Sequence, residues 1–248
     1  MEKAKAETNW VERAYNKLTA PKTVKYSGLL VLVLYLGLVS IGVLVAAILG
    51  PSGYSVTTHY ISALGSSDTT PVPILYDLAC IFAGTLTIPL SLYLEKHIAP
   101  IPRKAEDLPA PHRWSYRLTG TGFFFSLLGS IFYIGVGIFS ADRGEVRGIE
   151  MHNICSYATF GGFAFAALFL GFAIIFVRQP LIPKPYNYPL GIWGVVGPIT
   201  VAILNLTGLE GVTYEFLEWF LLWAILAWLI PLAIFTLRHI ERQLHNEK

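Results

Sequence analysis

The chain has 248 residues, of which 54% are apolar and only 14% are charged, and its formal net charge is +2. Because soluble domains carry about 25% charged residues, this composition excludes an ordinary soluble protein and predicts an integral membrane protein. The basic residues lie between apolar runs, so the charge favours contact with lipid headgroups and argues against a nucleic-acid partner.

Residues 1–26 form a predicted cytoplasmic arm that is rich in lysine and arginine. Between residues 8 and 20, apolar side chains recur at helical spacing: Trp10, Val11, Ala14, Tyr15 and Leu18. This pattern predicts a short amphipathic helix that lies on the membrane surface. The alternative is a solvated and poorly ordered arm, because chain termini are often untethered.

Six apolar runs follow, and each is long enough to cross a bilayer, which needs about 20 predominantly apolar residues. They occupy residues 27–50, 72–94, 118–140, 152–177, 189–209 and 214–237. Because the connections are short, consecutive helices are expected to be antiparallel neighbours. We therefore expect an all-α membrane protein. Its transmembrane domain, residues 27–238, is predicted to be a six-helix bundle of three antiparallel hairpins, with a cytoplasmic tail at 239–248.

Lysine and arginine are distributed unequally between the two sides of the predicted bundle. Of the 18 such residues, all except Arg143 and Arg147 lie on the side that holds both termini. Since basic residues are enriched in cytoplasmic loops, this asymmetry predicts a multi-pass protein of the cell membrane with both termini in the cytoplasm. The connections at 51–71, 141–151 and 210–213 would then face outward.

Several polar residues lie just inside the outer ends of the predicted helices. Because ionisable residues are costly inside a membrane, they usually face the bundle interior, and their common depth predicts a pocket that opens outward. The alternative is that the two glutamates among them lie hydrated in the headgroup zone. The residues are Asp77 in the second helix, His152 at the start of the fourth, Asn205 near the end of the fifth, and Glu215 and Glu218 at the start of the sixth.

The outer histidines and carboxylates are the candidate catalytic residues. His59 or His152 would act as a general base, and Asp77 or Glu215 as a general acid, because burial and mutual repulsion raise carboxyl pKa values. Two imidazoles with carboxylates also resemble a zinc site, but no His-Glu-x-x-His motif is present. We therefore expect a metal-free polar network without a cofactor. For each histidine the alternative is a structural hydrogen bond to a neighbouring loop.

Charges alternate in sign along the outer stretch at 139–153. Such patterns are usually solvated salt-bridge pairs worth under ~1 kcal/mol each. The functional alternative is that Arg143 or Arg147 holds a phosphate, because a guanidinium donates parallel hydrogen bonds to phosphate oxygens. Ser62, Asp142 and Asn205 complete the predicted substrate-binding lining.

Two short motifs stand near the predicted pocket: His-x-Ile-Ser-x-Leu-Gly at residues 59–65, and Phe-Ser-Ala-Asp at 139–142, which is followed by a glycine and by His152. Together with the six-helix plan, they resemble a prokaryotic membrane family known as domain of unknown function 998, over residues 25–238. That family is distantly similar to the Frag/DRAM/Sfk group, which implies lipid handling. A membrane hydrolase superfamily that includes alkaline ceramidases also uses Ser, His and Asp at the membrane edge, but its paired His-x-x-x-His in the last helix is missing here.

The sequence thus predicts an outward-facing pocket that binds, and as an enzyme modifies, a membrane lipid or a lipid-linked headgroup. Such an enzyme would be a hydrolase or transferase, with a histidine as base and a protonated carboxyl as acid. The first alternative is a non-enzymatic scaffold or subunit whose outer loops contact a membrane protein partner. The second is a small-molecule transporter, which the apolar inner halves of the predicted helices disfavour.

Overall fold

The computed structural model describes residues 9–51, 53–98, 113–177 and 181–246. Six of the basic residues counted for the predicted topology lie outside them: Lys3, Lys5, Arg103, Lys104, Arg178 and Lys248. In chain order the elements are α1 (Trp10–Leu18), α2 (Pro21–Leu49), the 3₁₀ helix η1 (Ile61–Gly65), α3 (Ile74–Ile98), α4 (Arg113–Ile138), β1 (Glu145–Val146), β2 (Ile149–Glu150), α5 (Met151–Phe176), α6 (Asn187–Thr207) and α7 (Tyr214–Asn246).

Six helices of the described chain, α2 to α7, are long and apolar enough to cross a membrane. The prediction of an all-α membrane protein is confirmed to the extent that the described chain has six helices of this length and composition. Several boundaries differ from the sequence prediction: α2 begins at Pro21 and α4 at Arg113, and the largest difference is at α7, which continues to Asn246 and includes most of the predicted tail. The residues added there are mainly good helix formers such as Arg, Glu, Gln and Leu, so the helix extends beyond its apolar part.

The predicted N-terminal helix is present as α1. The Asn9 side chain accepts a hydrogen bond from the Val11 amide at 3.3 Å, which caps the first turn. The Tyr15 hydroxyl donates to Glu95 of α3 at 3.1 Å and attaches α1 to the bundle. Burial, with the nearby Glu95 carboxylate, raises the pKa of Tyr15 to about 12. Trp10 and Val11 are exposed, which leaves apolar surface on α1.

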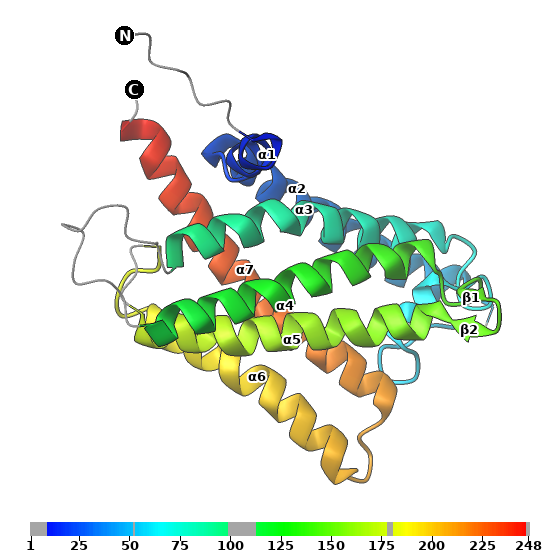
Figure 1. The fold of residues 1–248 in the computed structure, drawn as a ribbon. Coiled ribbons are helices and arrows are strands. Elements are labelled where there is room, and N and C mark those ends of the chain that lie inside the picture. The colour runs from blue at the N-terminus through cyan, green and yellow to red at the C-terminus, as the bar shows by residue number, and fades with distance from the viewer. Residues whose placement is uncertain (1–8, 52, 99–112, 178–180, 247–248) are drawn as a thin grey trace, which may run out of the picture.

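Each long helix packs against the next one in the chain, and α7 also packs against α2. Figure 1 shows α1 and the end of α7 at one end of the bundle, whereas β1 and β2 lie at the opposite end. We call this opposite end the η1 end, and define it by residues 53–73, 139–150 and 208–213. Figure 1 also shows α6 and the first half of α7 diverging from α4 and α5 towards the η1 end.

Small residues allow close approach in the centre of the bundle. Gly129 of α4 and Gly162 of α5 face each other so closely that a Cβ on Gly162 would lie 2.7 Å from the Gly129 Cα. Between α3 and α4, Ser91 and Ser126 share a hydrogen bond of 2.7 Å. Apolar surface gains little from association inside lipid, so such packing and interhelical hydrogen bonds are what hold spanning helices together.

Candidate functional site

The β1–β2 hairpin sets the start of α5. Its turn places Arg147 at φ 54° and Gly148 at φ 78°, and β2 leads directly into α5. The Met151 amide donates back to the Gly144 carbonyl at 3.0 Å, which closes the connection onto α4. His152, the second residue of α5, is therefore held against the end of α4.

Asp77, in the first turn of α3, is the centre of a polar cluster at the η1 end. Asp77 is only 4% exposed, and its Oδ2 accepts a hydrogen bond from the Ser140 hydroxyl at 2.7 Å. The Arg143 guanidinium donates to the same oxygen at 3.0 Å and to the Ser140 hydroxyl at 2.9 Å. Because a buried carboxylate is stable only when paired, this cluster locks the connection after α4 onto α3.

Asp142 extends this cluster to the connection before α3. Its Oδ2 accepts hydrogen bonds from the backbone amide and the hydroxyl of Ser67, at 2.9 and 2.7 Å. Its Oδ1 lies 3.2 Å from the Arg143 guanidinium. Burial raises the pKa of Asp142, but the Ser67 hydrogen bonds and Arg143 outweigh it, so the pKa lies below its ordinary value. Arg143, predicted to hold phosphate, is thus bound to two carboxylates of its own chain.

His152 is oriented by a backbone carbonyl. Its Nδ1 lies 2.6 Å from the Phe139 oxygen, and since a carbonyl only accepts, the proton is on Nδ1. The other nitrogen, Nε2, is then an acceptor, and it lies 3.4 Å from the Ser156 hydroxyl one turn later on α5. The residue is 7% exposed. A histidine held in one tautomer beside a serine hydroxyl has the arrangement needed for proton transfer.

Glu218, one turn into α7, holds the 3₁₀ helix against the bundle. Its Oε2 accepts a hydrogen bond from the Ile61 amide at 2.9 Å, at the start of η1, and Ser62 makes further polar contacts with the same carboxylate. The next residue, Trp219, donates its indole N–H to the His59 carbonyl at 3.1 Å. These contacts place Ser62 beside α7, although the two segments are far apart in the sequence.

A cavity of about 710 Å³ opens between α5, α6 and α7 at the η1 end. Most of its polar lining comes from residues close to the helix ends, and one or two turns further along each helix the lining becomes apolar. The polar lining residues include Ser62, His152, Asn153, Ser156, Asn205 and Glu218, and the apolar ones include Phe160, Ala164, Val201 and Leu221. This volume is within the usual range of small-molecule sites, about 300–1,000 Å³.

The predicted site residues are divided between the cavity and its surroundings. The structure brings together Ser62, His152 and Asn205 on the cavity wall, with Glu218 beside them. Asp77, Asp142 and Arg143 form the neighbouring polar cluster and are not part of the lining. The two groups are connected through consecutive residues, because Phe139 accepts from His152 and Ser140 donates to Asp77.

The remaining three predicted residues lie around the cavity, not on its wall. His59 stacks on Tyr54 with ring centroids 5.2 Å apart, and its Nδ1 lies 2.9 Å from the Thr58 hydroxyl. Glu215 lies near Tyr60, and burial together with the Glu215 and Glu218 carboxylates raises the pKa of that phenol. Arg147 is exposed at the β1–β2 turn. The catalytic and binding roles proposed for these residues stay predictions.

Ser156 is a cavity residue that is absent from the site predicted from the sequence. The signal that would have found it is its position four residues after His152, since residues at this spacing share one helical face. Within the described chain, no three or more His, Cys, Asp or Glu side chains group closely enough to hold a metal ion. The chemistry that the lining itself offers is hydrogen bonding and proton transfer.

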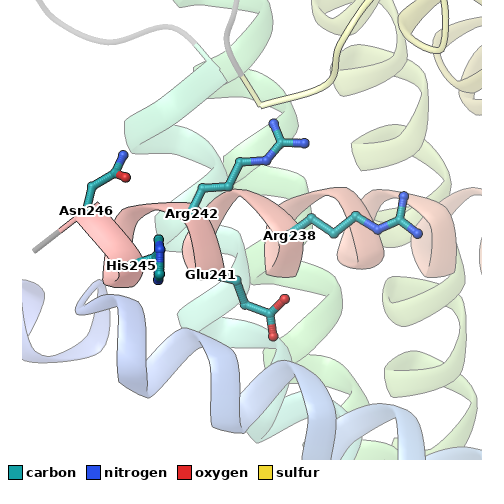
Figure 2. Close-up of a pocket in the computed structure, with 5 residues that line it drawn as sticks. All are labelled: Arg238, Glu241, Arg242, His245 and Asn246. Atoms are coloured by element: carbon teal, nitrogen blue, oxygen red, sulfur yellow. The ribbon is translucent and has the colours of Figure 1, made fainter. Parts of the chain in front are cut away.

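A second hollow lies at the opposite end of the bundle. Its lining comes from the last turns of α7 alone: Arg238, Glu241, Arg242, His245 and Asn246. Figure 2 shows Arg238 and Arg242 extending away from the side of α7 that Glu241 occupies, and Glu241 forms an ion pair of 2.9 Å with Lys25 of α2. Because the lining comes from one helix, no second element encloses a ligand there. The cavity between α5, α6 and α7 is therefore the better candidate site.

Comparison of the chain with models of protein families found no match, and comparison with curated proteins and with solved structures found none either. The class of this protein accordingly rests on its own fold. That fold has six helices long and apolar enough to cross a membrane, which indicates a multi-pass integral membrane protein.

Proposed function

We propose that this protein binds a membrane lipid, or a molecule linked to a lipid, in the cavity between α5, α6 and α7. In this proposal the protein is a multi-pass protein of the cell membrane, its six helices are arranged as three antiparallel hairpins, and both termini are cytoplasmic. The η1 end then faces outward. The resemblance to the domain of unknown function 998 family is in keeping with this proposal and itself stays a prediction.

The single observation that carries the proposal is the gradient of polarity along the cavity wall. On α5 the lining passes from His152 and Asn153 to Phe160 and Ala164, and on α6 it passes from Asn205 back to Val201. A lipid has the same gradient, with a polar head and an apolar chain. Because α6 and the first half of α7 diverge from α4 and α5 towards this end (Figure 1), a chain could lie between them and α5 while its head remains near the loops.

A cavity-filling substitution tests the proposal. A Cβ on Gly161, which lines the cavity, would meet no atom within 4 Å, so Gly161→Leu adds volume there without displacing backbone. A Cβ on Gly120 of α4 also meets nothing within 4 Å, and Gly120 does not line the cavity, which makes Gly120→Leu the matched control. Leucine has a higher helix propensity than glycine, so both variants should fold.

The readout is photo-crosslinking of a lipid with a diazirine in its acyl chain, followed by peptide mapping of the full chain in detergent micelles. The expected result is crosslinks to α5, α6 and α7 in the parent protein and in Gly120→Leu, with at least about a tenfold loss in Gly161→Leu. Equal labelling of all three proteins, or labelling confined to helix faces outside the cavity, would show that the cavity is not the lipid site.

A lipid-directed hydrolase or transferase is the second candidate, and the contact between His152 Nε2 and the Ser156 hydroxyl favours it. In acyl transfer, Nε2 would take the hydroxyl proton while Oγ attacks an ester carbonyl, and the same proton would then pass to the leaving alcohol. Water would release the acyl group from Ser156 in a hydrolase, and a second alcohol would do so in a transferase. A non-enzymatic scaffold is the remaining alternative, in which the polar cluster around Asp77 serves only to join loops.

A further inference from the structure

The described lining of the cavity between α5, α6 and α7 contains an acidic side chain and no permanently cationic one. It includes the carboxyl group of Glu218 and no Lys or Arg. In the neutral ring, whose proton the Phe139 carbonyl places on Nδ1, His152 presents Nε2 as an acceptor towards Ser156. The lining is therefore rich in hydrogen-bond acceptors and has no permanently cationic side chain.

The two arginines of the η1 end do not supply the missing positive charge. Arg143 is 3.0 Å from Asp77 and 3.2 Å from Asp142, so two carboxylates already neutralise it. Arg147 is exposed at the β1–β2 turn, and neither arginine lines the cavity. This arrangement argues against the phosphate-holding role that the sequence suggested for them.

Helix N-termini are the other common source of phosphate-binding donors. At each of the two N-termini at the edge of this cavity, one backbone amide already donates a hydrogen bond within the chain. The Met151 amide of α5 donates to the Gly144 carbonyl at 3.0 Å. The Phe216 amide of α7 donates to the Thr213 hydroxyl at 3.2 Å. Each terminus also carries a glutamate, Glu150 before α5 and Glu215 in α7, which opposes the approach of an anion.

We infer that the bound lipid has a head that donates hydrogen bonds and lacks phosphate, namely an amine or an amino alcohol. This inference rests on the proposed lipid-binding function. A carboxylate has about four acceptor positions, and Ile61 and Ser62 occupy only part of them, so Glu218 can still accept from an ammonium or hydroxyl group. Ser62, Ser156 and Asn205 add neutral partners at the same level of the cavity. A phosphate monoester at this position would meet an acidic side chain and no compensating cation.

The test uses three single-chain probes with the same diazirine-bearing tail: an amino alcohol, its phosphate monoester, and the alcohol without the amine. Crosslinking to the cavity peptides is titrated for each probe with the full chain in micelles of a non-ionic detergent. The amino alcohol is expected to reach half-maximal crosslinking at a concentration at least about tenfold lower than its phosphate ester, with the alcohol between them.

The variant Glu218→Gln tests whether Glu218 causes the preference for the amino alcohol over its phosphate ester. Glutamine keeps an oxygen acceptor for the Ile61 amide but removes the charge, so the ratio of half-maximal concentrations should fall to within about twofold. Glu210→Gln is the control, because Glu210 is exposed in the connection between α6 and α7, outside the lining, and the ratio should not change. Thermal unfolding of both variants establishes that they are folded.

Two results would overturn the inference and leave lipid binding intact. One is cavity crosslinking in which the phosphate ester is equal or superior to the amino alcohol. The other is a preference for the amine that Glu218→Gln does not reduce. Failure of every probe to label the cavity, when the same probes label other membrane-facing peptides, would instead overturn the proposed function, and the inference with it.

Discussion

Asp77 and Arg143 form an ion pair of 3.0 Å in which the carboxylate side chain is 6% exposed and the guanidinium side chain is 57% exposed. The pair joins the start of α3 to the connection between α4 and α5. Since Ser140 donates to the same carboxylate oxygen, two residues of the connection after α4 depend on Asp77.

Replacing this carboxylate should destabilise the protein. Asp77→Ala removes the acceptor for both Ser140 and Arg143, so we expect the free energy of unfolding to fall by about 1–3 kcal/mol. Unfolding in detergent micelles measures this change. Asp68→Ala, at an exposed position in the connection before α3, should change it by less than about 0.5 kcal/mol. Equal effects of the two substitutions would mean that the pair has no stabilising role.

Asp142 predicts a dependence of stability on pH. Its pKa is below the ordinary value of about 3.9 in the folded state, so the folded state binds fewer protons at this group than the unfolded state. The stability contributed by Asp142 is present above the ordinary pKa and is lost as the pH falls through the folded-state value. Melting temperatures measured from about pH 6 to about pH 3 should fall less steeply for Asp142→Asn than for the parent protein. Parallel curves would contradict this prediction.

The proposed topology predicts which positions a membrane-impermeant thiol reagent reaches from outside the cell. Arg147→Cys lies at the exposed turn of the η1 end and should be labelled in intact cells, whereas Asn246→Cys, exposed at the end of α7, should be labelled only after permeabilisation. The two native cysteines, Cys80 and Cys155, are free and buried, so the background should be low. The opposite labelling pattern would reverse the assignment of the outward face.

The contact between Ser156 and His152 makes a prediction for the hydrolase and transferase candidate. If His152 activates the Ser156 hydroxyl, a fluorophosphonate probe should label Ser156, and the labelling should be lost in Ser156→Ala and fall at least about tenfold in His152→Gln. Peptide mapping locates the adduct. Ser130→Ala, on the buried face of α4, is the control, and labelling should persist in it. Absence of labelling in the folded parent protein would contradict the hydrolase and transferase candidate and would not affect the lipid-binding proposal.

Hydropathy was sufficient to predict the six long helices, because a helix that crosses lipid must be apolar along most of its length. Predicting the site from the sequence was harder. Depth in the membrane follows from position along the chain, and so His152 and Glu218 were placed at a common level. The direction of a side chain depends on helix rotation, which changes by about 100° for each residue, and on the path of the loops.

The two partners of Arg143 illustrate why helices can be predicted from the sequence more easily than side-chain contacts. Its neighbour Asp142 is a partner that sequence spacing suggests, whereas Asp77 is 66 residues away and meets it only because the connection after α4 folds back onto α3. The same applies to Glu218, whose bond to the Ile61 amide spans 157 residues. Such long-range contacts determine which carboxylates line the cavity, and no local pattern encodes them.

The most direct test of the lipid-binding account is a high-resolution structure of the protein in lipid nanodiscs prepared with native membrane lipids. The account predicts continuous elongated density between α5, α6 and α7, with its head within hydrogen-bonding distance of Glu218 or His152 and its chain along Phe160 and Val201. A cavity that is filled by protein side chains, with lipid density only on the outer perimeter of the bundle, would contradict it.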